Sequence, residues 1–132
     1  MITAVDSCVL IDILTDDQEF ADASADRLRR ALARGAVVAC APVWAEVGSG
    51  FTEPNSVREV FSTLRIDYSE VSEEVALAAG EGMRRYRDRG GRRVRIASDF
   101  LIAAHAAVNG FPLLTRDQGL AKLPVDGLSL AD

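Results

Sequence analysis

Two patterns of apolar and polar residues alternate along this chain. Short, largely apolar runs have the length and β-branched content of strands, which predicts strands at 2–6, 36–40, 65–68, 111–115 and, as an edge strand, 126–130. Between these runs, apolar residues recur three and four positions apart, which is the spacing of a helix with one buried face. The predicted helices lie within 7–14, 15–35, 41–47, 54–64, 72–91, 97–110 and 116–123.

Capping residues mark several helix ends. Thr15 or Asp16 is available to cap the second helix, and Ser98 is available to cap the Ala-rich helix that ends at Gly110. The segment 72–91 begins with glutamates and ends with arginines, so its charges complement the helix dipole at both ends. These signals support the helical pattern independently of hydrophobicity.

Strand and helix follow one another repeatedly, which is typical of α/β proteins with a parallel sheet. The predicted strands are nearly continuous apolar runs, as expected for a sheet that is covered on both faces. We therefore predict an α/β fold, a three-layer α/β/α sandwich around a mostly parallel sheet of four or five strands. The length of 132 residues suits a single domain, 1–132.

The composition is that of a globular protein, with 48% apolar and 27% charged residues. The apolar segment 36–48 meets Pro42 and Glu46 well before the ~20 apolar residues that a membrane span needs. The first residues lack the basic start and long apolar stretch of a signal peptide, so we expect a cytoplasmic location. Cys8 and Cys40 form no CxxC motif, and we assign them no chemistry.

Charge is unevenly distributed along the chain. The formal net charge of −5 would oppose binding to nucleic-acid phosphates. However, fourteen of the fifteen basic residues are arginines, and seven of them fall within 84–95. The chain is therefore acidic overall and strongly basic in one short segment.

Four carboxylates stand at equivalent places in the predicted elements. One ends the first strand, one lies in the helix after the second strand, one begins the Ala-rich helix, and one follows the last core strand: Asp6, Glu46, Asp99 and Asp117. In an open parallel sheet, ligands bind in the crevice outside the carboxyl ends of the strands. We therefore expect these acids to point into one place. Each acid taken alone has a plainer explanation, as a helix cap or a turn residue.

Four carboxylates in one crevice repel each other, and a divalent cation would relieve that repulsion. Oxygen ligands favour Mg²⁺ or Mn²⁺, and His105 stands alone, so nothing suggests zinc. We predict one or two ions. Such a site can activate a water and stabilise the leaving oxygen of a phosphodiester, which is hydrolytic nuclease chemistry.

The four motifs together resemble the PIN domain, and more narrowly the VapC toxin ribonucleases of bacterial VapBC-type toxin–antitoxin pairs. They occur in the family's order across nearly the whole chain, as VDSCVLID at Asp6, WAEV at Glu46, ASDFLIAAHA at Asp99 and LLTRDQGL at Asp117. The resemblance implies Mg²⁺- or Mn²⁺-dependent endonucleolytic cleavage of RNA. It also implies a homodimer, and inhibition by a small cognate VapB-like antitoxin in a heterotetramer or larger complex.

By position, the resemblance makes the four acids the metal ligands and catalytic residues, and it gives supporting hydroxyls to Ser7 and Thr115. Plainer roles exist for both hydroxyls, since Ser7 can cap its helix and Thr115 can simply end a strand. Two positions depart from the family's pattern. Leu120 stands where an aromatic residue is common, and Gly119 stands where some members carry a further acid. These departures bear on the number of metal ions.

Arginines suit bidentate contact with phosphate, which makes several of them candidates for binding RNA. The candidates are Arg84, Arg85, Arg87, Arg92, Arg93, Arg95 and Arg116. For the arginines of segment 84–95, the plainer alternative is that they form the solvated end of a helix. Trp44 and the apolar face of the helix within 54–64 are interpreted as core, or as part of a groove for an antitoxin helix.

Two other functions remain open at this point. One is a catalytically silent PIN-like module that regulates or binds through a protein partner. The other is a receiver-type or phosphatase-like domain that gathers acids around Mg²⁺. The latter needs a nucleophilic Asp after a middle strand and a nearby Lys, whereas 36–40 ends without an acid and Lys122 is the only lysine.

Overall fold

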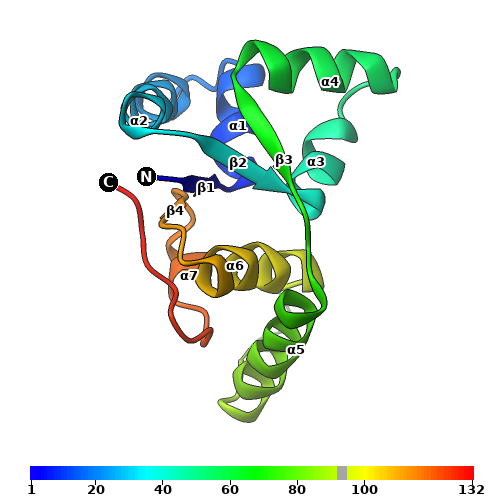
Figure 1. The fold of residues 1–132 in the computed structure, drawn as a ribbon, viewed down its shortest axis with the longest axis vertical. Coiled ribbons are helices and arrows are strands. Elements are labelled where there is room, and N and C mark those ends of the chain that lie inside the picture. Colours follow the sequence, from blue (N-terminus) through cyan, green and yellow to red (C-terminus); the bar gives the residue numbers. More distant parts are fainter. Residues whose placement is uncertain (92–94) are drawn as a thin grey trace.

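The computed structural model describes residues 1–91 and 95–132, and it contains a four-stranded sheet (Figure 1). The strand order is β3-β2-β1-β4, and every strand pair is parallel. This confirms the predicted α/β class and sets the sheet at four strands. The strands are β1 (Thr3–Val5), β2 (Val37–Cys40), β3 (Ile66–Ser69) and β4 (Leu113–Leu114).

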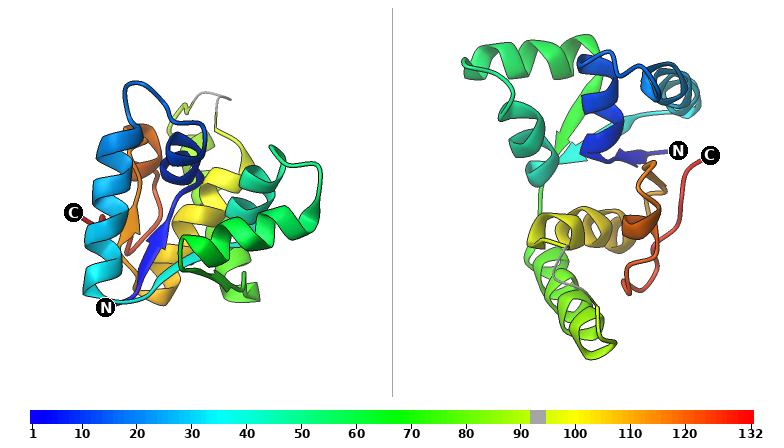
Figure 2. Two further views of the ribbon diagram at one scale, coloured as in Figure 1. Left: turned by 90° about the horizontal axis from the view of Figure 1, so that it is seen from above. Right: turned by 180° about the vertical axis from the view of Figure 1, so that it is seen from behind.

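Helices cover both faces of the sheet, which confirms the three-layer arrangement. In Figures 1 and 2, α1, α2 and α4 lie on one side of the strands, and α5, α6 and α7 lie on the other. Helix α3 lies beside the sheet and contacts both α1 and α6. The helices are α1 (Ser7–Leu14), α2 (Ala21–Arg34), α3 (Ala41–Gly48), α4 (Pro54–Thr63), α5 (Glu73–Asp88), α6 (Ala97–Asn109) and α7 (Gln118–Ala121).

The two central strands are buried on both faces. All three residues of β1 are buried, and in β2 only Val38 is partly exposed. Burial of consecutive apolar residues is what a parallel sheet between two helical layers requires. Because the register pairs Ala4 with Val38 and Val5 with Leu114, both neighbours of β1 end near its carboxyl end.

Segment 126–130 is not a strand, contrary to the prediction. Its contact with the sheet is a single parallel bridge between Leu113 and Leu130. Gly127 has a φ of 84°, so the chain turns there and does not extend. In addition, β4 has only two residues, so it offers few backbone groups for segment 126–130 to pair with.

Two predicted caps are also wrong. Thr15 ends α1, where its hydroxyl donates to the Ile11 carbonyl oxygen, and the next helix begins only at Ala21. The residue that stabilises this turn is Asp17, whose Oδ1 accepts from the backbone N–H groups of Glu19 and Phe20.

The second wrong cap is Ser98, because α6 already begins at Ala97, with Ile96 at the N-cap position and no side-chain cap. The Ser98 hydroxyl is directed to a carboxylate instead, as described below. The predicted stop at Gly110 is confirmed, with a left-handed φ of 72°.

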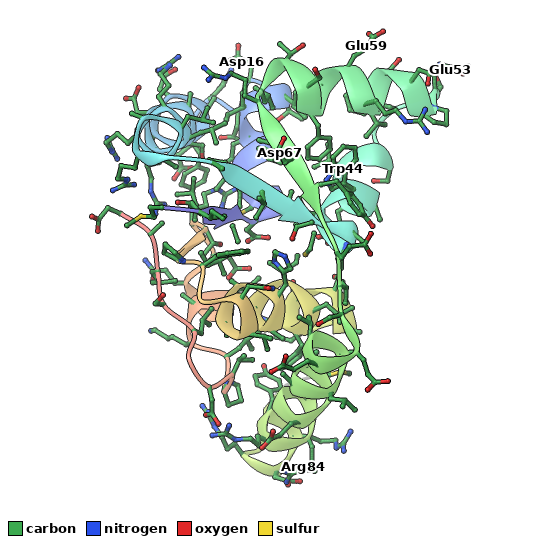
Figure 3. The ribbon with its side chains drawn as sticks, viewed as in Figure 1. Asp16, Trp44, Glu53, Glu59, Asp67 and Arg84 are labelled. Carbon is green, nitrogen blue, oxygen red and sulfur yellow. The ribbon has the colours of Figure 1, made fainter. Side chains whose placement is uncertain are left out.

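Trp44 and His105 both pack on the core. The Trp44 ring stacks on Phe61 with 3.8 Å between centroids, and Figure 3 shows it beside β3. His105 is 1% exposed, and its Nε2 lies 2.7 Å from the Ser69 hydroxyl. Within the part of the chain that is described, no helix has the length and apolar character needed to cross a membrane.

Candidate active site

The four predicted acids lie at the carboxyl ends of the strands. Asp6 directly follows β1 and is the N-cap of α1, and Asp117 follows β4 and is the N-cap of α7. Glu46 lies in α3, which starts where β2 ends, and Asp99 lies in the first turn of α6. Since β1, β2 and β4 are parallel neighbours, the segments that follow them meet at one edge of the sheet.

Asp6 is the most enclosed of the acids, with 3% of its surface exposed. Its carboxylate accepts from the Ser7 backbone N–H at 2.7 Å and from the Thr115 hydroxyl at 2.7 Å. The Cys8 thiol donates a further bond of 3.1 Å. These donors compensate for the burial of the charge, and Thr115 ties the end of β4 to the end of β1.

Glu46 is joined to Asp6 through Ser7. The Ser7 hydroxyl donates to Glu46 Oε1 at 3.0 Å, and the Ser98 hydroxyl lies 3.5 Å from Oε2. Burial raises the pKa of Glu46, and the negative charges of Asp6 and Asp99 raise it further. Ser7 and Thr115 therefore both contact acids, in the places where the sequence suggested supporting hydroxyls.

Asp117 and Asp99 share an arginine. Arg95 Nη1 and Nη2 donate to the two Asp117 oxygens at 2.7 and 2.8 Å, and Nη1 lies 3.6 Å from Asp99 Oδ2. The bidentate pair lowers the pKa of Asp117. The pKa of Asp99 is raised because burial outweighs the effect of Arg95, and Asp6 and Asp117 add to the rise.

Arg95 was among the candidate RNA contacts. Its side chain is 19% exposed and lies among the acids. Nothing in the local pattern of 91–96 distinguished Arg95 from the arginines around it, because its partners come from the start of α6 and the N-cap of α7. Arg92 and Arg93 lie outside the described residues.

The chemistry of the donors fits a divalent cation. All candidate ligands are oxygens, from four carboxylates and the hydroxyls of Ser7 and Thr115, and Mg²⁺ and Mn²⁺ prefer such a set. Arg95 already holds a positive charge between Asp99 and Asp117, so this part of the site accepts a cation. Within residues 1–91 and 95–132, no three Asp, Glu, His or Cys side chains are already grouped to hold a metal.

Three further residues contact the acids or their neighbours, and none of them was predicted to belong to the site. Cys8 bonds to Asp6, and burial together with that carboxylate raises the pKa of the thiol to about 11. Ser98 faces Glu46. Asp12, 2% exposed, accepts from Arg116 Nε and Nη2 at 2.6 and 2.8 Å. The sequence contained a signal for Asp12, because an acid within the apolar stretch VLIDIL indicates a buried carboxylate that needs a partner.

The remaining candidate RNA contacts lie at the end of α5. Arg84 pairs with Asp88 at 3.2 Å, and Arg85 pairs with Asp126 at 2.9 Å. Figure 3 shows Arg84 at the end of α5 that is farther from the sheet. Arg87 is exposed in the last turn of the same helix. These arginines lie apart from the acidic edge, and their role in binding RNA stays a prediction.

The parallel sheet and its acidic edge define an α/β domain whose candidate site lies beyond the carboxyl ends of the strands. The family model of the PIN domain matches residues 3–126. The chain therefore belongs to the PIN domain family.

Solved structures of toxin–antitoxin complexes have the same fold. A chain of VapBC2 from Rickettsia felis, bound to a promoter DNA fragment, is 18% identical with a TM-score of 0.76, over 99% of this chain and 98% of that chain. A chain of VapBC-1 from nontypeable Haemophilus influenzae is 18% identical with a TM-score of 0.75, over 100% of this chain and 98% of that chain. A chain of a toxin–antitoxin complex from Klebsiella pneumoniae is 17% identical with a TM-score of 0.67, over 96% of this chain and 94% of that chain. No curated protein matches the chain.

Proposed function

We propose that this protein is a Mg²⁺- or Mn²⁺-dependent endoribonuclease that acts as the VapC-type toxin of a toxin–antitoxin pair in the cytoplasm. The observation that carries the proposal is the linkage of the four acids. Ser7 donates its backbone N–H to Asp6 and its hydroxyl to Glu46, and the Thr115 hydroxyl donates to Asp6 and accepts from the Asp117 backbone N–H. Arg95 then connects Asp117 to Asp99. Membership of the PIN family and the likeness to the VapBC chains support the same function.

In this proposal, Asp6, Glu46, Asp99 and Asp117 hold one or two divalent ions. A bound ion would supply a more acidic water and charge stabilisation for the leaving oxygen of the phosphodiester. Thr115 fixes the Asp6 carboxylate, and Ser7 fixes Glu46 relative to it. Ser7 and Thr115 therefore preorganise the oxygens of Asp6 and Glu46, which lowers the cost of arranging them when a cation arrives. Arg95 binds both Asp117 oxygens, so a cation that used them would have to displace it.

The deciding experiment compares Asp99→Asn with Asp88→Asn on a closed circular RNA, which has no ends for an exonuclease. Asp99 is part of the acidic edge, whereas Asp88 is an exposed residue at the end of α5 that pairs with Arg84. We expect the wild type and Asp88→Asn to cut the circle with Mg²⁺ or Mn²⁺, and Asp99→Asn to lose the activity while keeping its melting temperature. Cleavage that persists in a chelator would contradict the mechanism.

A groove next to Glu46 suits the proposed antitoxin. Two adjoining pockets of about 430 and 380 Å³ share Phe51, and the second also has Glu46 in its wall. Ile11 and Leu14 line the second pocket and remain 39% and 37% exposed. An apolar segment seated there would cover the approach to Glu46, which accounts for inhibition by a small partner.

This part of the proposal is tested by looking for a small reading frame that adjoins the gene and co-purifying its product with this protein. The double variant Ile11→Ser, Leu14→Ser should lose the partner, whereas Leu77→Ser on α5, where the side chain is 69% exposed, should retain it. Light scattering of the free protein and the complex then tests the proposed homodimer and heterotetramer. Undiminished binding by the double variant would place the antitoxin elsewhere.

One observation favours a second candidate, a silent module that acts only through a partner. Arg95 already neutralises part of the acidic edge, and among the described residues no three potential ligands are grouped for a metal. A thermal melt with Mn²⁺ discriminates between the two, because an ion that binds the native state must raise stability by mass action. A melting temperature that Mn²⁺ leaves unchanged favours the silent module.

A further inference from the structure

A polar pocket of about 350 Å³ opens beside the acidic edge. It lies between the start of α7 and the face of α2, and its walls include Phe20, Arg27, Arg116 and Gln118. It also shares Thr115 and Asp117 with the candidate active site. A group held in this pocket would therefore lie next to whatever the acids hold.

Arg27 brings an unneutralised positive charge to this pocket. Its Nη1 donates to the Thr115 carbonyl oxygen at 3.0 Å, and its Nη2 donates to the Ala131 carbonyl oxygen at 3.2 Å. Both acceptors are neutral, and no carboxylate of the described residues lies within 4.0 Å of the guanidinium. Two of the five N–H donors make these bonds, so the group is oriented and keeps donors for an anion.

Arg116 is the second basic residue in the pocket wall, and it is held in place by its neighbours. Asp12 binds its Nε and Nη2, and Ser24 donates to the same carboxylate at 2.7 Å. The guanidinium also lies over the Phe20 ring, 4.0 Å from the centroid. These contacts fix the plane of the guanidinium while 35% of the side chain remains exposed.

Three charged residues line the pocket, and two of them, Arg27 and Arg116, are positive while Asp117 is negative. Arg116 is paired with Asp12, and Asp117 is paired with Arg95, whereas Arg27 has no carboxylate partner among the described residues. A chain with a net charge of −5 thus presents a local cation beside its acidic edge. Arginine is the residue best suited to bidentate contact with phosphate oxygens.

We propose that this pocket is a phosphate subsite, which binds a phosphodiester of single-stranded RNA next to the bond that the acids cleave. This inference rests on the proposed function for the identity of the polymer. Arg27 is the principal anion contact, and Arg116 is the second basic residue in the wall. The subsite would offset the repulsion between the RNA backbone and the acids, and would fix the position of the RNA along the acidic edge.

The test measures binding of a labelled single-stranded oligoribonucleotide in a chelator, so that its outcome does not depend on cleavage. Arg27→Gln should weaken binding about tenfold. The slope of log K against log salt concentration should become shallower by about 0.7, as expected for one lost phosphate contact. Arg30→Gln, on the exposed side of the same helix, should change neither quantity. Equal affinities and slopes for both variants would overturn the proposal.

A second substitution guards against loss of folding, because Arg27 also ties down the chain near Ala131. Gln118→Glu places a negative charge at the pocket rim, in the first turn of α7, where the helix tolerates an acid. It should weaken binding several-fold, whereas Gln18→Glu, the same change at the chain's only other glutamine, should not. Equal binding by both glutamate variants would likewise overturn the subsite.

Inorganic phosphate provides a probe that is independent of the polymer. In an NMR titration at constant ionic strength, the Arg27 Nε–H resonance should shift saturably with phosphate in the wild type and in Arg30→Gln. An unaffected resonance would contradict the subsite. If the subsite is confirmed and circular RNA is still not cut with Mg²⁺ or Mn²⁺, the proposed nuclease function fails alone. If RNA is cut and the Arg27 variants bind normally, the subsite fails alone.

Discussion

The contact of Arg95 with two acids leads to a quantitative prediction about metal binding. A divalent cation and Arg95 compete for the same carboxylates, so Arg95→Gln should bind Mn²⁺ more tightly than the wild type does. Two unit charges 3.6 Å apart, the separation of Arg95 and Asp99, attract by about 1 kcal/mol in water and by about 5 kcal/mol at an effective dielectric constant of 20.

The environment of the pair lies between these limits, since the side chains of Arg95 and Asp99 are 19% and 20% exposed. We therefore expect the Kd for Mn²⁺ to fall roughly tenfold to a hundredfold, which corresponds to about 1.4 to 2.8 kcal/mol. Without metal, the variant should be less stable than the wild type by about 1 to 3 kcal/mol, because Asp117 loses its charged partner.

Calorimetric titration with Mn²⁺ measures the affinity, and melts in chelator and in excess Mn²⁺ measure the two stabilities. Arg84→Gln is the matched control, because its ion pair with Asp88 is exposed at the end of α5. The Arg95→Gln variant should have a lower melting temperature than the wild type in chelator, and Mn²⁺ should raise its melting temperature by more. A Mn²⁺ affinity that is unchanged or weaker in Arg95→Gln would refute the competition.

Three other predictions concern the fold that positions the site. Burial lowers the pKa of His105, so below pH ~6.5 the unfolded chain binds a proton that the folded chain excludes. The free energy of unfolding should fall as the pH drops through this region, and His105→Gln should lose that part of the pH dependence in urea titrations. Asp12→Asn leaves Arg116 without its buried counter-charge and should cost about 2 to 4 kcal/mol in the same assay. Phe61→Ala removes a ring that is 1% exposed and stacked on Trp44, and should cost about 3 to 5 kcal/mol. A cost below about 1 kcal/mol for either substitution would contradict the packing described.

The features that could be predicted from the sequence depend on local pattern. The run that became β2 is uninterrupted and apolar, the run that became β1 is broken only by Thr3, and each is followed at once by a helix with an acid at its N-cap or within it. Parallel pairing then brings those helix starts to one edge without any knowledge of tertiary contacts. The positions of Asp6 and Glu46 followed from these two facts.

The features that were missed depend on partners far away in the chain. Arg95 lies 22 residues from Asp117, and Arg116 lies 104 residues from Asp12. No periodicity encodes which of several arginines reaches an acid. Ser98 was read as a cap because serine often caps helices, but its hydroxyl contributes to the site by facing Glu46. Segment 126–130 has a strand's composition but only a two-residue neighbour to pair with.

The pairing of the last strand with the first has a consequence for biosynthesis. β1 emerges from the ribosome early, but its partner β4 and the hydroxyl of Thr115 that holds Asp6 are made more than a hundred residues later. The edge that gathers the acids therefore cannot be completed on a partly translated chain. If the protein is the ribonuclease proposed above, its nascent chain would therefore lack activity until Thr115 and Asp117 have been synthesised.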